Sequence, residues 1–214
     1  MNSYYKEKLY PLQDKVFNAL EEAGLPFYLT GGTALHRCYY QVRYSDDLDF
    51  FVNDAPDFSS LQDEVIRALK NLDCKIVRRS AEYLEMTVGE KLKVDFVNDV
   101  PAHLGEIETF SLYYRVDNVF NILANKLGAL LHREEPKDVV DIWVIWRENE
   151  IDWPEMFTAA GSKAAGIYPP QVGRKIDEMP ETLLEKIKFT EQDYLDKFVK
   201  EKEKLVNSIL AKAD

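Results

Sequence analysis

Aspartates stand inside a run of apolar residues at positions 47–52, which reads DLDFFV. Side chains alternate between the two faces of a strand, so Asp47 and Asp49 would share one face and the apolar residues between them the other. Asp95 has the matching parity in the strand-like segment 91–97. If the two strands are neighbours, three carboxylates converge on one polar face. A pair of surface acids on an edge strand is the alternative.

Three ionised carboxylates need cations to lie together, because like charges otherwise raise their pKa values or hold them apart. Hard cations such as Mg²⁺, or Mn²⁺ in its place, prefer carboxylate and phosphate oxygens. A pair of such ions about 3.5–4 Å apart can hold the attacking and leaving oxygens of an in-line phosphoryl displacement. The acids therefore predict a metal site for phosphoryl chemistry at Asp47, Asp49 and Asp95.

Gly31 and Gly32 lie where a short strand, 27–30, gives way to a predicted helix over 33–40. Glycines let the backbone approach a phosphate closely, and a helix N-terminus offers unpaired N–H donors to the same group. Thr33 adds a hydroxyl. We expect these three residues to hold phosphate, although most glycine pairs are only tight turns.

Charged residues also cluster between 126 and 141. Lys126 borders an apolar helical stripe and could reach across a cleft to phosphate. The alternative is a surface lysine whose aliphatic stem packs on the protein while its ammonium stays in water. Arg133 and Lys137 flank Pro136, while Asp138 and Asp141 share a face of the next helix. These four either support the site or form a salt-bridge cluster at a helical corner.

The elements that must position these residues change in character along the chain. The first part predicts helices over 3–23, 33–40 and 58–72, and strands over 27–30, 47–52, 75–79, 83–88 and 91–97. From 117 onward the pattern is helical, over 117–132, 137–148, 153–161 and 190–212, with loops and short helices over 162–189. We expect an α+β fold, a small mixed sheet with flanking helices followed by a helical region, with domains at 1–116 and 117–214.

Composition limits the functional classes. The chain has 214 residues, 46% of them apolar, and a formal net charge of −11. This balance argues against a general nucleic-acid coat but leaves room for a local basic cleft. Two cysteines outside any CxxC pair argue against a structural zinc site or a disulfide framework. With no signal sequence or membrane-spanning stretch, we expect a cytoplasmic protein without membrane contact.

Four ordered motifs resemble a known family. The segments GGTALHR, RYSDDLDFF, KVDFV and NKLGALLHREEPKDVVDIW, within residues 28–146, are similar to those of the AbiEii/AbiGii toxins. These belong to the DNA polymerase β-type nucleotidyltransferase superfamily. The resemblance implies metal-dependent transfer of a nucleoside monophosphate from an NTP to a hydroxyl acceptor.

The resemblance also implies roles for individual residues. Asp47 and Asp49 would bind metal, Asp95 would help to deprotonate the attacking hydroxyl, and Lys126 would hold the triphosphate. Gly31, Gly32 and Thr33 would hold phosphate. Supporting positions are Arg43, Ser45, Arg133, Lys137, Asp138 and Asp141. The implied partners are an RNA acceptor, tRNA in particular, and a cognate antitoxin.

Other functions remain open at this point. The enzyme could instead modify a small hydroxylated molecule such as an antibiotic, and the acidic balance favours a cationic acceptor of that kind. The chain could also be a nucleotide-binding module without turnover, or an α/β domain whose acids are surface residues only.

Overall fold

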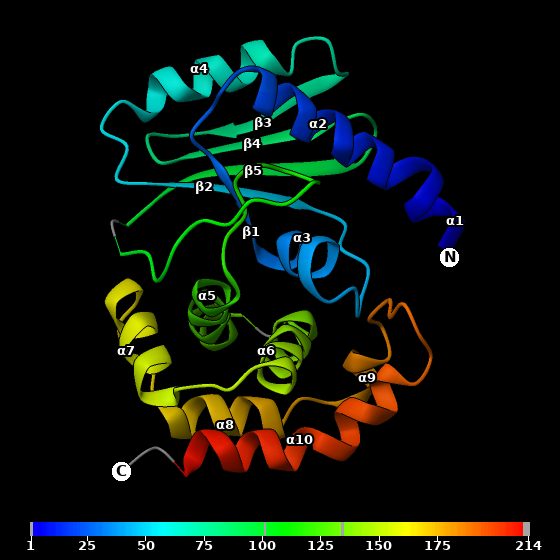
Figure 1. Ribbon diagram of the computed structural model, residues 1–214, viewed down its shortest axis with the longest axis vertical. Coiled ribbons are helices and arrows are strands. Elements are labelled where there is room, and N and C mark those ends of the chain that lie inside the picture. The colour runs from blue at the N-terminus through cyan, green and yellow to red at the C-terminus, as the bar shows by residue number, and fades with distance from the viewer. Residues whose placement is uncertain (1, 101, 134, 212–214) are drawn as a thin grey trace. The chain divides into compact units, whose positions relative to one another are not determined.

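The computed structural model describes residues 2–100, 102–133 and 135–211, which form two compact units (Figure 1). The first unit takes in 1–39, 45–101 and 106–117, and the second takes in 40–44, 102–105 and 118–214. The units interleave along the chain, so no single cut separates them. The domains 1–116 and 117–214 stay a prediction.

A mixed five-stranded sheet forms the centre of the first unit, in the order β1-β2-β5-β4-β3. Its strands are β1 (Tyr28–Thr30), β2 (Leu48–Asn53), β3 (Cys74–Arg79), β4 (Tyr83–Val88) and β5 (Leu92–Asp99). β2 and β5 run parallel, while the other neighbours are antiparallel. The five predicted strands are therefore present, with bounds shifted by at most two residues.

One face of this sheet is apolar because alternate residues of the central strands are buried. Phe50 of β2 and Phe96 of β5 stack at 5.3 Å between ring centroids. Helices α2 (Tyr10–Glu22) and α4 (Phe58–Ala68) cover this face, α2 placing Phe17 at 6.0 Å from Phe50. Figure 1 shows both helices on the same side of the sheet. The opposite face carries the polar members of the alternation.

The remaining helical segments of the first unit contain π-helical turns. The N-terminal helix predicted over 3–23 consists of α1 (Asn2–Tyr4), η1 (Tyr5–Leu9) and α2, with Pro11 in the first turn of α2. Proline has no N–H to lose at that position, so it begins a helical segment there and breaks none. The glycine pair opens α3 (Gly31–Ala34), which continues into η2 (Leu35–Tyr39).

The second unit is helical. Its helices are α5 (Val119–His132), α6 (Pro136–Glu148), α7 (Trp153–Lys163), α8 (Pro169–Asp177), α9 (Glu181–Leu184) and α10 (Tyr194–Leu210). α5 packs against α6 and α7, and α8 against α10. Buried Trp143 of α6 meets Phe198 of α10 edge to face at 5.7 Å. Residue 212, the predicted end of the last helix, lies outside the described residues.

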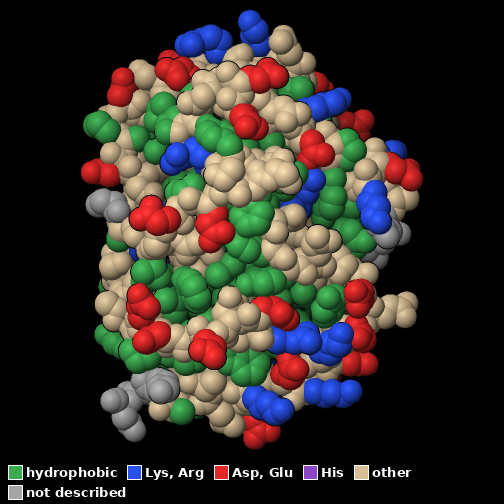
Figure 2. Space-filling view, viewed as in Figure 1, with side chains coloured by type: hydrophobic (Ala, Val, Ile, Leu, Met, Phe, Trp, Pro, Cys, Tyr) green, Lys and Arg blue, Asp and Glu red, His purple; other side chains and the backbone are tan. Residues whose placement is uncertain are grey.

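The expected α+β class, with a mixed sheet followed by helices, is confirmed. Within the described residues, no helix combines the length and apolarity that crossing a membrane requires. On the face shown in Figure 2, acidic and basic side chains are interspersed with apolar and uncharged surface. The surplus of acids is therefore not gathered into one patch on that face.

Candidate active site

Three carboxylate residues lie in register across the polar face of the sheet. Asp49 of β2 is the Cα partner of Asp95 on β5, and Asp95 is in turn the partner of Glu85 on β4. Neighbouring strands are about 4.8 Å apart, so residues in register present their side chains side by side on one face. The structure therefore brings Asp49 and Asp95 together, and it adds Glu85, which the motif reasoning did not include.

Asp47 lies one residue before β2 and is half-buried. Its main-chain carbonyl accepts a hydrogen bond from the Thr33 hydroxyl at 2.5 Å. Thr33 is fully buried, so this bond fixes the chain just ahead of the acids. The hydroxyl that was predicted to hold phosphate is thus engaged with the backbone of a predicted metal ligand.

Gly31 begins the turn that follows β1 and has a left-handed backbone, with φ of +66°. A Cβ atom at this position would lie 2.7 Å from Oδ2 of Asp49. Two effects therefore disfavour other residues at this position: the left-handed backbone conformation, and the Asp49 carboxylate, which would collide with a Cβ atom. The neighbouring Gly32 is buried in the first helical turn, whose N–H groups have no partners one turn earlier in the helix.

Asp117, which the motifs do not include, anchors this glycine turn. The Thr30 hydroxyl donates to Oδ2 of Asp117 at 2.6 Å, and the Asp117 N–H donates to the Leu29 carbonyl at 2.8 Å. Tyr39 donates its hydroxyl to the Asp117 carbonyl at 2.9 Å. Both ends of the segment from β1 to η2 are therefore tied to one fully buried residue.

Asp95 is 8% exposed, and both of its carboxylate oxygens accept hydrogen bonds. Lys93 donates to Oδ2 at 2.6 Å, and the Tyr83 hydroxyl lies 2.9 Å from Oδ1 and 3.2 Å from Oε2 of Glu85. Burial raises the pKa of Tyr83, and the bond to Asp95 raises it further, so the phenol stays protonated. Burial lowers the pKa of Lys93, but Asp95, Glu85 and Asp49 outweigh this effect and raise it overall.

Within the described residues, no group of three or more His, Cys, Asp or Glu is arranged to hold a metal ion. The three predicted ligands are thus not brought together as a ready set, and both oxygens of Asp95 are engaged by Lys93 and Tyr83. The chemistry of the donors still suits a hard divalent cation. Asp49 and Asp95 supply carboxylate oxygens at neighbouring strand positions, and Gly31 leaves room beside one of them.

The second unit contains a buried network of charges. Arg43 binds Asp141 through two bonds of 2.7 Å, and Lys126 contacts Oδ1 of Asp138 and Oδ2 of Asp141, each at 2.7 Å. Arg133 completes the network with bonds of 2.8 and 3.0 Å to Asp138. Among the described residues, three cations thus contact these two carboxylates.

Each charge in this network is held by its neighbours. Burial lowers the pKa of Lys126, but Asp141 and Asp138 raise it overall, so the ammonium is retained. Burial raises the pKa of Asp138, and the opposing effect of Lys126 and Arg133 brings it below the usual value. The salt-bridge cluster that was the alternative for these residues is therefore present. Among the described residues, Lys137 is not a member of it.

Ser45, another predicted supporting residue, belongs to the first unit. It is 7% exposed, and its carbonyl accepts a bond of 3.3 Å from the Gln13 amide. Ser45 therefore helps to hold the segment before β2 to α2.

The whole chain was compared with family models. Residues 16–207 match the model described as "Nucleotidyl transferase AbiEii toxin, Type IV TA system". The chain belongs to the AbiEii nucleotidyltransferase toxin family. The resemblance seen in the four motifs is thereby confirmed, and the chain is a nucleotidyltransferase. None of the curated proteins matches it.

Solved structures share the fold. JHP933 from Helicobacter pylori has a TM-score of 0.62 at 19% identity, with 96% of this chain and 91% of that chain covered. MenT4, a nucleotidyltransferase toxin of Mycobacterium tuberculosis H37Rv, has a TM-score of 0.57 at 16% identity, covering 96% and 92%. The antibiotic-resistance factor ANT(2")-Ia, bound to adenylyl-2"-tobramycin, has a TM-score of 0.54 at 14% identity, covering 71% and 94%.

Proposed function

We propose that this AbiEii-family protein transfers a nucleoside monophosphate from an NTP to a hydroxyl group of RNA, tRNA in particular, with release of pyrophosphate. The observation that carries the proposal is the side-by-side placement of Asp49 and Asp95, with Gly31 pressed against Asp49. A structural role alone gives no reason to line up acids beside a glycine that must remain a glycine.

Asp47, Asp49 and Asp95 would hold divalent metal, Mg²⁺ or Mn²⁺. When bound, such ions supply positive charge to the phosphates and to the attacking and leaving oxygens. Asp95 would accept the proton of the acceptor hydroxyl, the role that the family resemblance implies for the third acid. Tyr83 and Lys93 orient Asp95 for this task through their bonds to its two oxygens.

Gly31 and Gly32 would receive phosphate oxygens on their backbone N–H groups at the start of α3. We assign Lys126 to the triphosphate. An ammonium has three N–H donors, and Asp138 and Asp141 account for two of them, which supports a third for phosphate. Arg43 and Arg133 would act through the carboxylates that they bind, Asp141 and Asp138, and so keep the lysine in one position.

The proposal is tested by incubating the protein with α-labelled NTPs, Mg²⁺ and total RNA, and by following label into RNA. Asp49→Asn and Asp95→Asn should each abolish transfer. Asp63→Asn is the matched control, because this exposed acid of α4 pairs with Arg79 at the surface, where ion pairs contribute little. Absence of transfer to any acceptor, under conditions where NTP binds, refutes the proposal.

The same assay separates the alternatives. ANT(2")-Ia shares the fold and was solved with an adenylylated antibiotic, so tobramycin is a suitable small acceptor to include. Label on tobramycin and none on RNA would assign the chain to small-molecule modification. NTP binding without pyrophosphate release, with either acceptor, would identify a binding module.

We further propose that a cognate antitoxin counteracts the protein, as the toxin–antitoxin family implies. Expression of the chain alone should arrest growth, and the Asp49→Asn variant should not. Restoration of growth by a small co-transcribed neighbour would identify the antitoxin. Normal growth on expression of an active enzyme would contradict a toxin role.

A further inference from the structure

The polar face of the sheet carries basic residues at its edge, on the strand farthest from β1. One row of residues in register across this face, from β2 to the edge strand β3, consists of Asp49, Asp95, Glu85 and Arg78. The neighbouring row, from β5 to β3, consists of Lys93, Thr87 and Lys75. Lys75 and Arg78 of β3 therefore extend the same face that presents the acids.

A bulge in β3 gives Arg78 its place on this face. The register between β3 and β4 shifts just before Arg78, so that Val77 is the extra residue of β3. In a regular strand Val77 would lie opposite Glu85, and Arg78 would turn to the face that α4 covers. Arg79 shifts in the same way and reaches α4, where it donates to Gln62 at 2.7 Å. Bulges are known to re-aim side chains in this manner, often next to active sites.

Both cations are open to a ligand from solvent. Lys75 and Arg78 are exposed, and within the described part of the chain neither forms an ion pair with a carboxylate. Arg78 lies over the ring of Tyr83, with its guanidinium 5.6 Å from the ring centroid. The Tyr83 hydroxyl in turn lies 2.9 Å from Oδ1 of Asp95 and 3.2 Å from Oε2 of Glu85. Arg78 is thus linked to the acids through one aromatic side chain.

The strand geometry sets the distances along this face. Arg78 lies two strands from Asp95 in the same row, which is about 10 Å, and Lys75 lies about 7 Å from Arg78 in the next row. The side chain of Lys93, between them and the acids, is 42% exposed, so the surface is accessible there. A stacked nucleic-acid strand advances about 3.4 Å per nucleotide, so about 10 Å corresponds to about three nucleotides. Arginine and lysine are the side chains that bind phosphate best.

We propose that Lys75 and Arg78 bind backbone phosphates of the acceptor RNA and so hold its hydroxyl group beside Asp95. The inference rests on the proposed function and names the surface on which its acceptor lies. Two cations beside the acids let a chain with a net charge of −11 bind a polyanion locally. Charged residues and bulges also protect edge strands from pairing with other chains, but that role predicts no effect on RNA binding.

The test is the affinity of a short fluorescein-labelled single-stranded RNA, measured by anisotropy over a range of salt concentrations. In Lys75→Gln/Arg78→Gln the affinity should fall, and the slope of log affinity against log salt should become less steep by about 1.4, or about 0.7 for each lost phosphate contact. Lys75→Gln alone leaves the contact between Arg78 and Tyr83 intact and should change the slope by about 0.7. Lys75→Arg/Arg78→Lys keeps both charges and should keep the slope.

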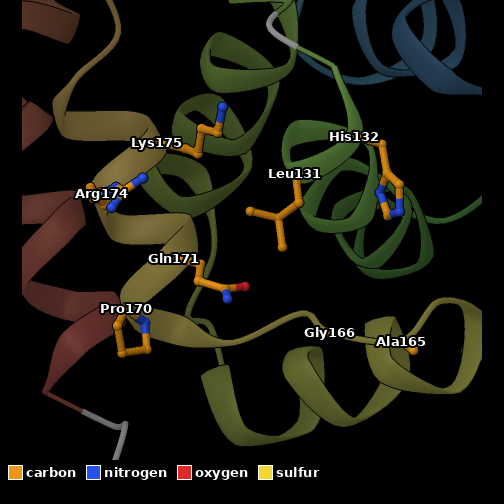
Figure 3. Close-up of a pocket in the computed structure, with 8 residues that line it drawn as sticks. All are labelled: Leu131, His132, Ala165, Gly166, Pro170, Gln171, Arg174 and Lys175. Carbon is orange, nitrogen blue, oxygen red and sulfur yellow. The ribbon is translucent and has the colours of Figure 1, made fainter.

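The chain offers two controls of the same charge. Arg67→Gln/Lys70→Gln removes one arginine and one lysine, both exposed, in and just after the last turn of α4, which covers the opposite face of the sheet. Arg174→Gln, matched to Arg78→Gln, removes a cation from the lining of a cavity of about 580 Å³ in the helical unit (Figure 3). Both controls should keep the wild-type slope. An unchanged slope in Lys75→Gln/Arg78→Gln, an equal change in the controls, or no RNA binding by wild type overturns the assignment.

Kinetics of nucleotide transfer separate this inference from the proposed function. In Lys75→Gln/Arg78→Gln the KM for RNA should rise, while kcat and the KM for NTP stay unchanged. A fall in kcat at an unchanged KM for RNA would mean that Arg78 acts on Asp95 through Tyr83, and overturns the assignment alone. If wild type binds RNA through Lys75 and Arg78 but transfers no nucleotide to any acceptor, the proposed function fails and the phosphate contacts stand.

Discussion

Replacement of Gly31 by alanine should damage the active site far more than it damages the fold. Gly31 has φ of +66°, and an alanine Cβ there would meet Oδ2 of Asp49 at 2.7 Å, well short of the 3.4 Å of an ordinary contact. The left-handed backbone alone costs an alanine about 1–2 kcal/mol. The contact adds a displacement of the Asp49 carboxylate, and a misplacement of about 1 Å at a reacting centre can reduce the rate by about a hundredfold.

The chain offers a control with the same backbone strain and no contact. Gly24, in the turn after α2, has φ of +64°, and a Cβ there would meet nothing within 4 Å. Gly24→Ala should therefore lower the free energy of unfolding by about 1–2 kcal/mol and leave activity unchanged. Urea unfolding and nucleotide transfer would be measured for both variants. Equal activity of the two, at stabilities that keep both folded, would refute the close approach of Gly31 to the acids.

Further predictions concern the buried network and the surroundings of the acids. Asp138→Asn should lower the free energy of unfolding by about 3–5 kcal/mol at neutral pH, because it leaves Lys126 and Arg133 without a full counter-charge. The pKa of Asp138 is lowered in the folded protein, so wild type should be more stable than Asp138→Asn at pH values above the ordinary pKa of 3.8 and should lose this extra stability as the pH falls below it. The free energies of unfolding of both proteins would be measured in urea at several pH values, and a difference that does not change with pH would contradict the role of this carboxylate. Lys93→Met should tighten Mn²⁺ binding, measured by calorimetry, because one cation no longer competes for Asp95. Lys91, an exposed residue in the turn before β5, gives the control Lys91→Met, and equal affinities in the two variants would contradict the competition. Thr33→Val should cost about 1 kcal/mol of stability and reduce transfer, since a buried hydrogen bond to the Asp47 carbonyl is lost; full activity would show that this anchor is dispensable.

The arrangement of the acids could be predicted from sequence because strand parity is a local property. The alternation in 47–52 and 91–97 places Asp49 and Asp95 on the polar faces of their strands without knowledge of any contact. The same rule, carried around the turn at Gly89, reaches Glu85, whose buried neighbours are Leu84 and Met86. The alternation in 83–88 could therefore have predicted Glu85 on the same polar face as the aspartates.

Other features could not be predicted because they join residues that are distant in sequence. Asp141 meets Arg43 across 98 positions, and Thr30 meets Asp117 across 87. The pattern shows that such residues are polar, but the partner of a buried charge depends on the tertiary arrangement. The Thr33 hydroxyl is similar, since its acceptor is a backbone carbonyl, which every residue offers and no motif marks.

The central claim is that Asp49 and Asp95 bind divalent metal together with the nucleotide, and calorimetric titration of Mn²⁺ in the presence of an NTP tests it most directly. The account predicts specific binding to wild type and to Asp63→Asn, and its loss in both Asp49→Asn and Asp95→Asn, with all four proteins folded. An Mn²⁺ affinity equal to that of wild type in either Asp49→Asn or Asp95→Asn would contradict the claim.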